Sequence, residues 1–231
     1  ETPLYHKGSV LYGIQATRDS IRKNGYAILV EGYMDFLKLY QGSVSNILAI
    51  SGTAFTKKHV STLNRITKKV VLFYDGDDAG SNATIKAGWI LLQKELDPMV
   101  VRPPKGLDPD DWIDKIGKEK IVKKLSTPES FINFNIKFHE GKNLEGAEKK
   151  EYVIKLAKEI KNIQDGIIRN DLVRFISSEL KIDEKDFIRT LKTQRILKTV
   201  TSGMDSIEKK KITFTSKIEK AQLELVKLML S

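Results

Sequence analysis

The sequence predicts an α/β domain with a mostly parallel sheet flanked by helices, followed by an all-α helical subdomain. Through the first half, short runs of β-branched and aromatic residues alternate with longer segments whose apolar residues recur at helical spacing. Strands that alternate with helices in this way are typical of βαβ units. After about residue 114 the strand signals fade and helical periodicity continues with little Gly or Pro. This second part is therefore expected to be a small bundle of antiparallel helices.

Each element can be placed from its pattern. The apolar runs predict strands at residues 26–30, 46–50, 70–74 and 99–103. The segments between them predict helices at residues 34–41, 57–67 and 82–96. In the second half, helical spacing covers residues 130–138, 151–160, 171–180 and 185–192. Residues 199–211 are polar and basic, as in a linker, and residues 216–230 are amphipathic and are expected to open a further domain.

Charge and composition favour a phosphate-bearing partner and exclude several classes of protein. The 40 Lys and Arg residues outnumber the 30 Asp and Glu residues and leave a formal charge of +10, which attracts polyanions. The chain has no cysteine, so it forms neither a disulfide framework nor a thiolate zinc site. No apolar stretch approaches the roughly 20 residues of a membrane span, and no signal peptide is visible. A cytoplasmic protein without a membrane partner is expected, and the start at Glu1 rather than Met favours a piece of something longer.

Carboxylates follow three of the four predicted strands, at the point where each strand ends. In open α/β sheets, ligands bind beyond the carboxyl ends of the strands, so these acids are expected to share one edge of the sheet. Alternate residues of an extended segment point the same way, and a Gly between two of them adds no bulk. The residues are Glu31 after the first strand, Asp35 one helical turn later, Asp75 and Asp77 after the third strand, and Asp108 and Asp110 after the fourth.

Such a cluster of acids calls for a cation, because the carboxylates repel one another and would otherwise hold their protons. Mg²⁺ or Mn²⁺ fits best, since Mg²⁺ takes a few carboxylate oxygens, several waters and substrate phosphates. A site of this kind supports phosphoryl transfer. A single Asp after a strand is more often a helix cap or turn residue, and this is the alternative for Asp35, Asp78 and Asp111. Asp75 and Asp77 are the expected ligands, and Asp78 is expected at the helix start.

Three stretches together resemble the Toprim domain, and in particular that of bacterial DnaG-type primases. They are "ILVEGYMDFLKLYQGSVSNILAISGTAFT", "VVLFYDGDDAGSNATIKA" and "PKGLDPDDWI". The Toprim signature is a Glu after one strand and an Asp-x-Asp after another, here Glu31 with Asp75 and Asp77. "ETPLYHKGSVLYG" resembles the basic segment that leads into Toprim in these primases. The implied division is a lead-in at 1–25, Toprim at 26–115, a helical subdomain at 116–198, and a linker with the start of a helicase-binding region at 199–231.

The resemblance implies a nucleotidyltransferase, a DNA-directed RNA polymerase that makes short RNA primers on a single-stranded DNA template. The primer 3′ hydroxyl would attack a metal-bound ribonucleoside triphosphate, and pyrophosphate would leave. By this resemblance the principal catalytic metal ligands are Glu31, Asp75 and Asp77, with Asp35, Asp108 and Asp110 as further acids of the same site.

Two departures from the family pattern matter. Leu107 stands where relatives often carry a charged residue, which puts a polar role at that position in doubt. The family's zinc-binding domain, the rest of its amino-terminal subdomain and most of its helicase-binding domain lie outside this sequence. The chain alone is therefore expected to synthesise little or no primer, and to bind the replicative helicase poorly.

The basic and aromatic residues allow two interpretations each. Lys7 matches a basic position of the family that could meet nucleotide phosphates or the template. Among the nucleic-acid candidates, Lys57 and Lys58 belong to a charge run that is more typical of a solvated face, and Lys86 fits either interpretation. We interpret the three histidines as surface or packing residues and the two tryptophans as core residues, and the role of Tyr33 stays open. These residues are His6, His59, His139, Trp89 and Trp112.

Three other functions share part of the pattern. Another Toprim enzyme, a topoisomerase or a nuclease, would carry the same Glu and Asp-x-Asp, although a topoisomerase also needs a nucleophilic tyrosine domain. A haloacid-type phosphatase would use Asp75 as a covalent nucleophile. A non-catalytic alternative is an interaction module of the replisome, with the helical part and residues 217–230 as its docking elements.

Overall fold

The computed structural model describes residues 8, 10–52 and 54–193. The chain divides into two compact units, Glu1–Leu191 and Lys192–Ser231, and nearly all of the described residues belong to the first. His6, Lys7, the predicted linker and the amphipathic segment at 216–230 lie outside the described residues. Within the described part, no helix has the length and apolar character needed to cross a lipid bilayer.

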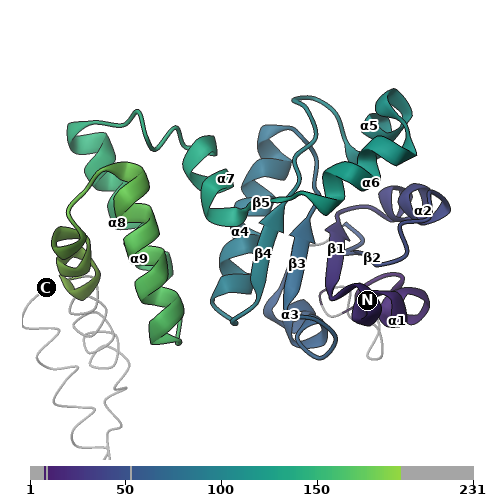
Figure 1. Ribbon diagram of the computed structural model, residues 1–231, viewed down its shortest axis with the longest axis horizontal. Coiled ribbons are helices and arrows are strands. Elements are labelled where there is room, and N and C mark those ends of the chain that lie inside the picture. Colours follow the sequence, from purple (N-terminus) through teal and green to yellow (C-terminus); the bar gives the residue numbers. More distant parts are fainter. Residues whose placement is uncertain (1–7, 9, 53, 194–231) are drawn as a thin grey trace, which may run out of the picture. The chain divides into compact units, whose positions relative to one another are not determined.

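A five-stranded, mostly parallel sheet forms the centre of the first unit (Figure 1). Its strands are β1 Tyr26–Val30, β2 Ile47–Ala49, β3 Lys69–Leu72, β4 Asp97–Val100 and β5 Glu129–Ser130, in the order β2-β1-β3-β4-β5. The first four run parallel, as predicted, and β5 pairs antiparallel with β4. At the opposite edge, an antiparallel bridge joins Tyr12 to Ala49 of β2. The sequence did not indicate β5, which has only two residues.

Nine named helices surround and follow the sheet in the described part of the chain. They are α1 Ile14–Asn24, α2 Tyr33–Gln41, α3 Lys57–Leu63, α4 Asp78–Leu92, α5 Pro109–Ile116, α6 Lys118–Ser126, α7 Phe131–Phe138, α8 Gly146–Ile160 and α9 Gly166–Leu180, and residues 184–193 are also helical. The predicted helices are confirmed in place and type. α1 was predicted only as part of a lead-in segment, because it is polar and buries only Thr17 and Ile21.

The two faces of the sheet carry separate cores, because successive strand residues point to opposite sides. Ala27 and Leu29 of β1 pack on one face with residues of α1, α3 and α4. Ile28 and Val30 pack on the other face with residues of α2, α5 and α6. β1 is buried on both faces, which explains why it reads as a continuous apolar run rather than an alternating one.

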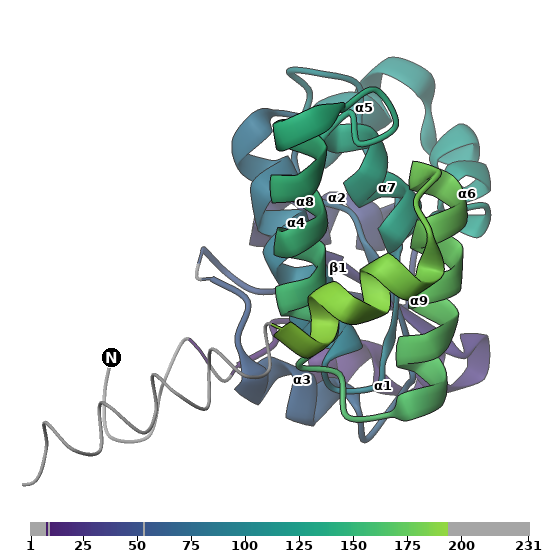
Figure 2. The same ribbon diagram turned by 90° about the vertical axis from the view of Figure 1, so that its left-hand side faces the viewer.

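A third core lies among α7, α8, α9 and the helix at residues 184–193 (Figure 2). α4 belongs to two cores at once, since Ala87 and Leu91 face the sheet while Trp89 and Leu92 face the helical part. Trp89 meets Phe131 edge to face, with ring centroids 5.2 Å apart. The expectation of a helical second half is confirmed. The domain boundary at residue 115 stays a prediction, although α6 beyond it still packs on the sheet.

Candidate metal centre

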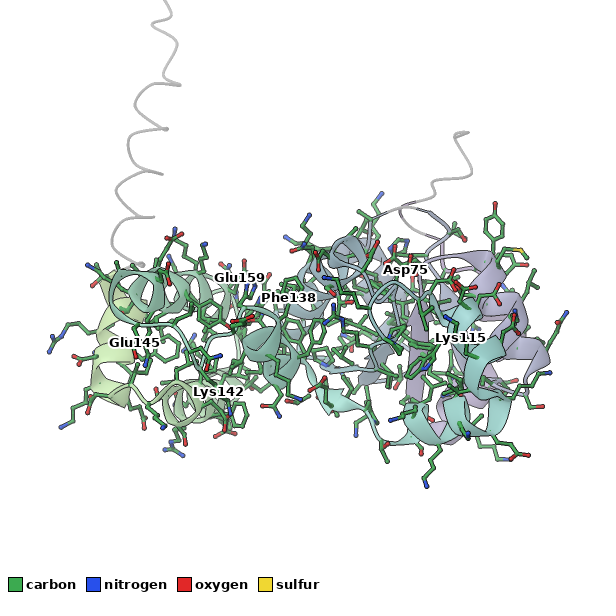
Figure 3. All side chains as sticks on the ribbon, turned by 90° about the horizontal axis from the view of Figure 1, so that it is seen from above. Asp75, Lys115, Phe138, Lys142, Glu145 and Glu159 are labelled. Atoms are coloured by element: carbon green, nitrogen blue, oxygen red, sulfur yellow. The ribbon has the colours of Figure 1, made fainter. Side chains whose placement is uncertain are left out.

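The carboxyl ends of β1 and β3 bring acids from separate parts of the chain to one cavity. Glu31 directly follows β1, and Asp75 follows β3, which pairs with β1 in parallel through Leu29 and Leu72. Asp75 lies among several side-chain oxygens in Figure 3. The cavity measures about 310 Å³ and is lined by Glu31, Gly32, Met34, Asp35, Gly52, Asp75, Asp108 and Asp110. Five of the six acids proposed from the sequence therefore line one cavity.

The sixth acid, Asp77, is held differently. Its Oδ1 accepts a hydrogen bond from the backbone N–H of Gly80 at 2.7 Å, which makes it the N-cap of α4. Asp78 is the first residue of that helix, as expected, but the capping carboxylate belongs to Asp77. One oxygen of Asp77 is thereby engaged. Its charge still raises the pKa values of Glu31 and Asp75, so Asp77 lies close to the cavity.

Two of the cavity acids are helix caps as well. Asp35 Oδ2 accepts from Gly32 N–H at 3.1 Å at the start of α2, and Asp108 Oδ1 accepts from Asp111 N–H at 2.6 Å at the start of α5. An ionised carboxylate has about four acceptor sites. A capping bond fixes the orientation of each side chain and leaves oxygen lone pairs for a ligand. The cap and ligand interpretations of these acids are therefore compatible.

A lysine that the sequence pattern did not single out contacts the same group of acids. The ammonium of Lys38 on α2 forms an ion pair with Asp110, and a second one with Asp114 at 2.5 Å. These contacts raise the pKa of Lys38 above its ordinary value. The available signal was its position three residues after Asp35, which puts both side chains on one side of α2.

A close backbone approach positions Asp75 against the loop that carries Asp108. A Cβ on Gly76 would lie 2.3 Å from the carbonyl oxygen of Pro104 and 2.8 Å from that of Pro103. The N–H of Gly76 donates to the carbonyl of Leu107 at 2.8 Å, and Arg102 Nη2 donates to the carbonyl of Gly76 at 3.1 Å. Only a residue without a side chain fits here.

The departure at Leu107 is explained by the same turn. Its side chain is partly buried against the core under α2 and α5. Its carbonyl accepts the hydrogen bond from Gly76. The backbone and an apolar side chain therefore hold the loop, without a charged group at this position.

Burial and mutual repulsion disfavour the charged forms of the cavity acids. Burial, followed by the charges of Asp75, Asp35 and Asp77, raises the pKa of Glu31 to about 7. Burial also raises the pKa of Asp35 to about 6, against the opposing effect of the Gly32 N–H bond. The pKa of Asp75 is raised by burial and by the neighbouring aspartates. Among the described residues, Glu31 Oε1 is buried without a hydrogen-bond partner.

These features fit a hard divalent cation. The possible donors are carboxylate oxygens, and one of them, Glu31 Oε1, is buried without a hydrogen-bond partner. Among the described residues, five acids line the cavity and no lysine or arginine does. In the part of the chain that the structure describes, no three acids or histidines are spaced as a ready-made ligand set. This is compatible with Mg²⁺, which keeps several waters and binds proteins through one or two carboxylates.

The described nucleic-acid candidates come from two helices, α3 and α4. Lys57 and Lys58 are exposed at the start of α3. Lys86 is exposed on α4 and lines a larger cavity of about 990 Å³, to which Glu31 and Tyr74 also belong. Lys7 lies outside the described residues. The structure therefore brings only Lys86 to a cavity that also includes a predicted catalytic acid.

The packing predictions for two histidines and both tryptophans are confirmed. His59 is buried, accepts from Thr56 N–H at 3.2 Å and stacks on Phe55. His139 is exposed, although its ring contacts Phe138 and Tyr152, and partial burial lowers its pKa. The two buried tryptophans are Trp89 and Trp112.

Comparison with known proteins places this geometry in a family. The family described as Toprim-like matches residues 28–113. The DNA primase of Staphylococcus epidermidis is 31% identical over 235 aligned residues, which cover 98% of this chain and 39% of that protein. The crystal structure of the zinc-binding and RNA polymerase domains of Aquifex aeolicus primase shares 31% identity with a TM-score of 0.71, covering 82% of this chain and 45% of that one. The structure of a DnaG primase catalytic domain bound to single-stranded DNA shares 28% identity with this chain at a TM-score of 0.70. The match covers 80% of this chain and 61% of that one.

The fold and the acidic cavity define a Toprim protein, with residues 28–113 as the Toprim domain. The helical part that follows also matches the DnaG catalytic structures, which cover about four fifths of the chain. The chain belongs to the bacterial DnaG-type DNA primases. It spans about two fifths of the length of the curated relatives it matches.

Proposed function

We propose that this chain carries the metal-dependent catalytic centre of a DNA primase, which joins ribonucleotides into short RNA primers on a single-stranded DNA template. The observation that supports this most directly is the single cavity lined by five carboxylates, one of them with a buried, unpartnered oxygen. A nucleotidyl transfer centre needs such donors, because metal-held phosphates react through positioning and charge neutralisation.

Glu31 and Asp75 are the proposed inner ligands, because they follow adjacent parallel strands and line the same cavity. The remaining oxygen of Asp77 is proposed to complete the principal set. Asp35, Asp108 and Asp110 are further acids of the site. A bound Mg²⁺ or Mn²⁺ would supply charge neutralisation for the triphosphate and activation of the attacking hydroxyl.

The protein side chains have supporting tasks in this proposal. The caps at Asp35, Asp77 and Asp108 hold the loops after β1, β3 and β4 in fixed positions. No side chain is required as a nucleophile, because the primer 3′ hydroxyl attacks and pyrophosphate leaves.

The proposed substrates are ribonucleoside triphosphates, an RNA primer and the DNA template. The formal charge of +10 favours such polyanions. The related DnaG catalytic domain solved with single-stranded DNA supports the same partner. Lys57, Lys58 and Lys86 are proposed phosphate contacts, and Lys7 remains a proposal outside the described residues. We propose a cytoplasmic location, and helicase contact through the family's carboxy-terminal domain rather than through these residues.

The metal centre can be tested by Mn²⁺ binding, measured by electron paramagnetic resonance. Asp75→Ala is expected to weaken binding by about tenfold or more, because even the loss of a residue that only supports a metal ligand costs that much. The control is Asp111→Ala, since Asp111 is exposed, contributes its N–H rather than its carboxylate to the Asp108 cap, and does not line the cavity. Equal losses in both variants, or none in Asp75→Ala, would contradict the proposed ligand.

The catalytic part of the proposal has its own test. A chain that spans two fifths of its relatives is expected to bind metal but to synthesise little or no primer alone. An assay with single-stranded template and labelled ribonucleotides measures this directly. Full primer synthesis by these 231 residues would refute the expectation that other parts of the family's polymerase are needed.

A further inference from the structure

Lys38 places its ammonium beside the acidic cavity. The ammonium of Lys38 pairs with Asp110, which lines the same cavity as Glu31 and Asp75, and also with Asp114 outside that cavity. The side chains of Lys38 and Asp110 are each 31% exposed, whereas that of Asp114 is 68% exposed. Lys38 therefore reaches from the protein surface to the border of the cavity.

The position of this ammonium is fixed by two packed helices. On α2, Lys38 lies between the buried residues Phe36 and Leu39. On α5, Asp110 and Asp114 are four residues apart, and therefore on one side of the helix, while the buried Trp112 lies on the other side. Both helices pack into the same core on one face of the sheet. The ion pairs thus join two rigid elements rather than two mobile side chains.

The acids of the cavity fall into two groups. Asp110 already has a cation, Lys38, although its Oδ1 is buried as Glu31 Oε1 is. The inner acids Glu31 and Asp75 have raised pKa values, and Glu31 Oε1 is buried without a partner among the described residues. An ammonium that holds one carboxylate oxygen competes with a divalent ion for it, and its charge opposes the approach of a second cation.

We infer that Lys38 is a built-in counter-cation, a positioning residue that keeps the Asp110 carboxylate away from the metal and leaves the other acids of the site as its ligands. The inference rests on the proposed metal centre and refines it. Lys38 then limits how tightly the site holds its ion, which leaves coordination positions for the phosphates of a nucleotide. Asp110 becomes available as a ligand only when Lys38 releases it.

The test compares Mn²⁺ binding by isothermal titration calorimetry in the whole chain and in three variants. Lys38→Met is expected to lower the Kd for Mn²⁺ by about tenfold, because a nearby positive charge is removed and Asp110 is freed. Lys38→Arg retains the charge and should bind as the unaltered chain does. Lys115→Met is the matched control, since Lys115 is an exposed lysine on α5 (Figure 3) that does not line the cavity, and its substitution removes the same charge.

A double variant separates release of Asp110 from a general charge effect. Lys38→Met with Asp110→Asn should lose most of the gain in affinity, because the freed carboxylate is removed. Circular dichroism checks that each variant folds. An equal Kd in Lys38→Met, Lys115→Met and the unaltered chain would overturn the inference while leaving the metal centre intact. Absence of Mn²⁺ binding in the unaltered chain and in all variants would overturn both, whereas binding only in Lys38→Met would support the inference.

Discussion

Glu31 is the acid on which the chemistry of the cavity depends most. Glu31 directly follows a buried strand, and its Oε1 has no hydrogen-bond partner among the described residues. Burial raises its pKa, and the charges of three neighbouring aspartates raise it further. With a pKa near 7, its carboxyl group is about half protonated at neutral pH in the absence of metal. Metal binding and proton release are therefore linked at this residue.

The raised pKa values predict how the stability of the metal-free chain depends on pH. Glu31 and Asp35 have pKa values near 7 and 6, above their ordinary 4.5 and 3.8, so the folded state binds more protons than the unfolded state. Stability should therefore be greatest below about pH 4 to 5 for these groups and should fall as the pH rises toward 7. Allowing for solvent screening, the loss is about 1 to 2 kcal/mol. Urea unfolding in EDTA at several pH values measures it.

The variant Glu31→Gln should remove about half of this dependence, since a neutral amide cannot ionise in the cavity while Asp35 still titrates. It should also make the metal-free chain more stable than the unaltered chain at pH 8, by about 1 kcal/mol. A steeper pH dependence in Glu31→Gln would show that other groups cause the effect.

The same linkage predicts proton release when metal binds. At pH 6.5, Mn²⁺ must displace the proton of Glu31, whose pKa is about 7, so the apparent Kd should be about fourfold weaker than at pH 8.5. Calorimetry in two buffers of different ionisation enthalpy counts the released protons. A pH-independent Kd with no released proton would mean that Glu31 does not bind the ion.

At the level of single residues, the sequence located the acids but not their individual tasks. Glu31 and Asp75 could be placed because a residue after a buried parallel strand must emerge at the carboxyl edge of the sheet. The choice between Asp77 and Asp78 as the cap depends on where α4 begins, and a shift of one residue exchanges their roles. The ion pairs of Lys38 depend on how α2 meets α5, which no local pattern encodes.

The turn after β3 requires glycine at position 76. Gly76→Ala should destabilise the chain by about 1 to 3 kcal/mol and weaken Mn²⁺ binding, because its Cβ would meet backbone carbonyls that cannot move aside cheaply. Thermal unfolding and Mn²⁺ titration measure the two effects.

Gly166→Ala at the start of α9 provides the matched control. There the nearest atom to a new Cβ is a flexible Arg169 nitrogen at 3.8 Å, so stability should stay the same or rise slightly. If both substitutions had the same effect, the close approach at Gly76 would not be a constraint.

Among the elements, the strands buried on both faces were the easiest to predict. β1 begins and ends where its apolar run does, because both of its faces are covered. β5 could not be predicted, since its two residues become a strand only by pairing with Met99 and Val100 of β4. α1 was missed because it is mostly polar and buries only two residues, so it contains few apolar residues that could indicate a helix.

For the whole molecule, the net charge predicts salt-sensitive binding of single-stranded DNA. The Lys57→Ala, Lys58→Ala double variant should bind more weakly. It should also lower the slope of log affinity against log salt by about 1.4, or roughly 0.7 for each phosphate that no longer meets a lysine. Fluorescence anisotropy across a salt series measures both quantities. The charge-matched control is Lys149→Ala with Lys150→Ala on α8. An identical change in both pairs would indicate a diffuse charge effect rather than binding by α3.

The two edges of the sheet have a consequence for how the chain behaves in concentrated solution. A free strand edge exposes unpaired amide and carbonyl groups, and these can recruit a strand from another molecule. Here the bridge between Tyr12 and Ala49 covers part of one edge, and β5 pairs with β4 at the other. The Tyr12–Ala49 bridge and the β4–β5 pairing are both short. Each still uses backbone groups that a strand from another molecule would need for pairing. Loss of either would favour aggregation, even though neither touches the metal centre.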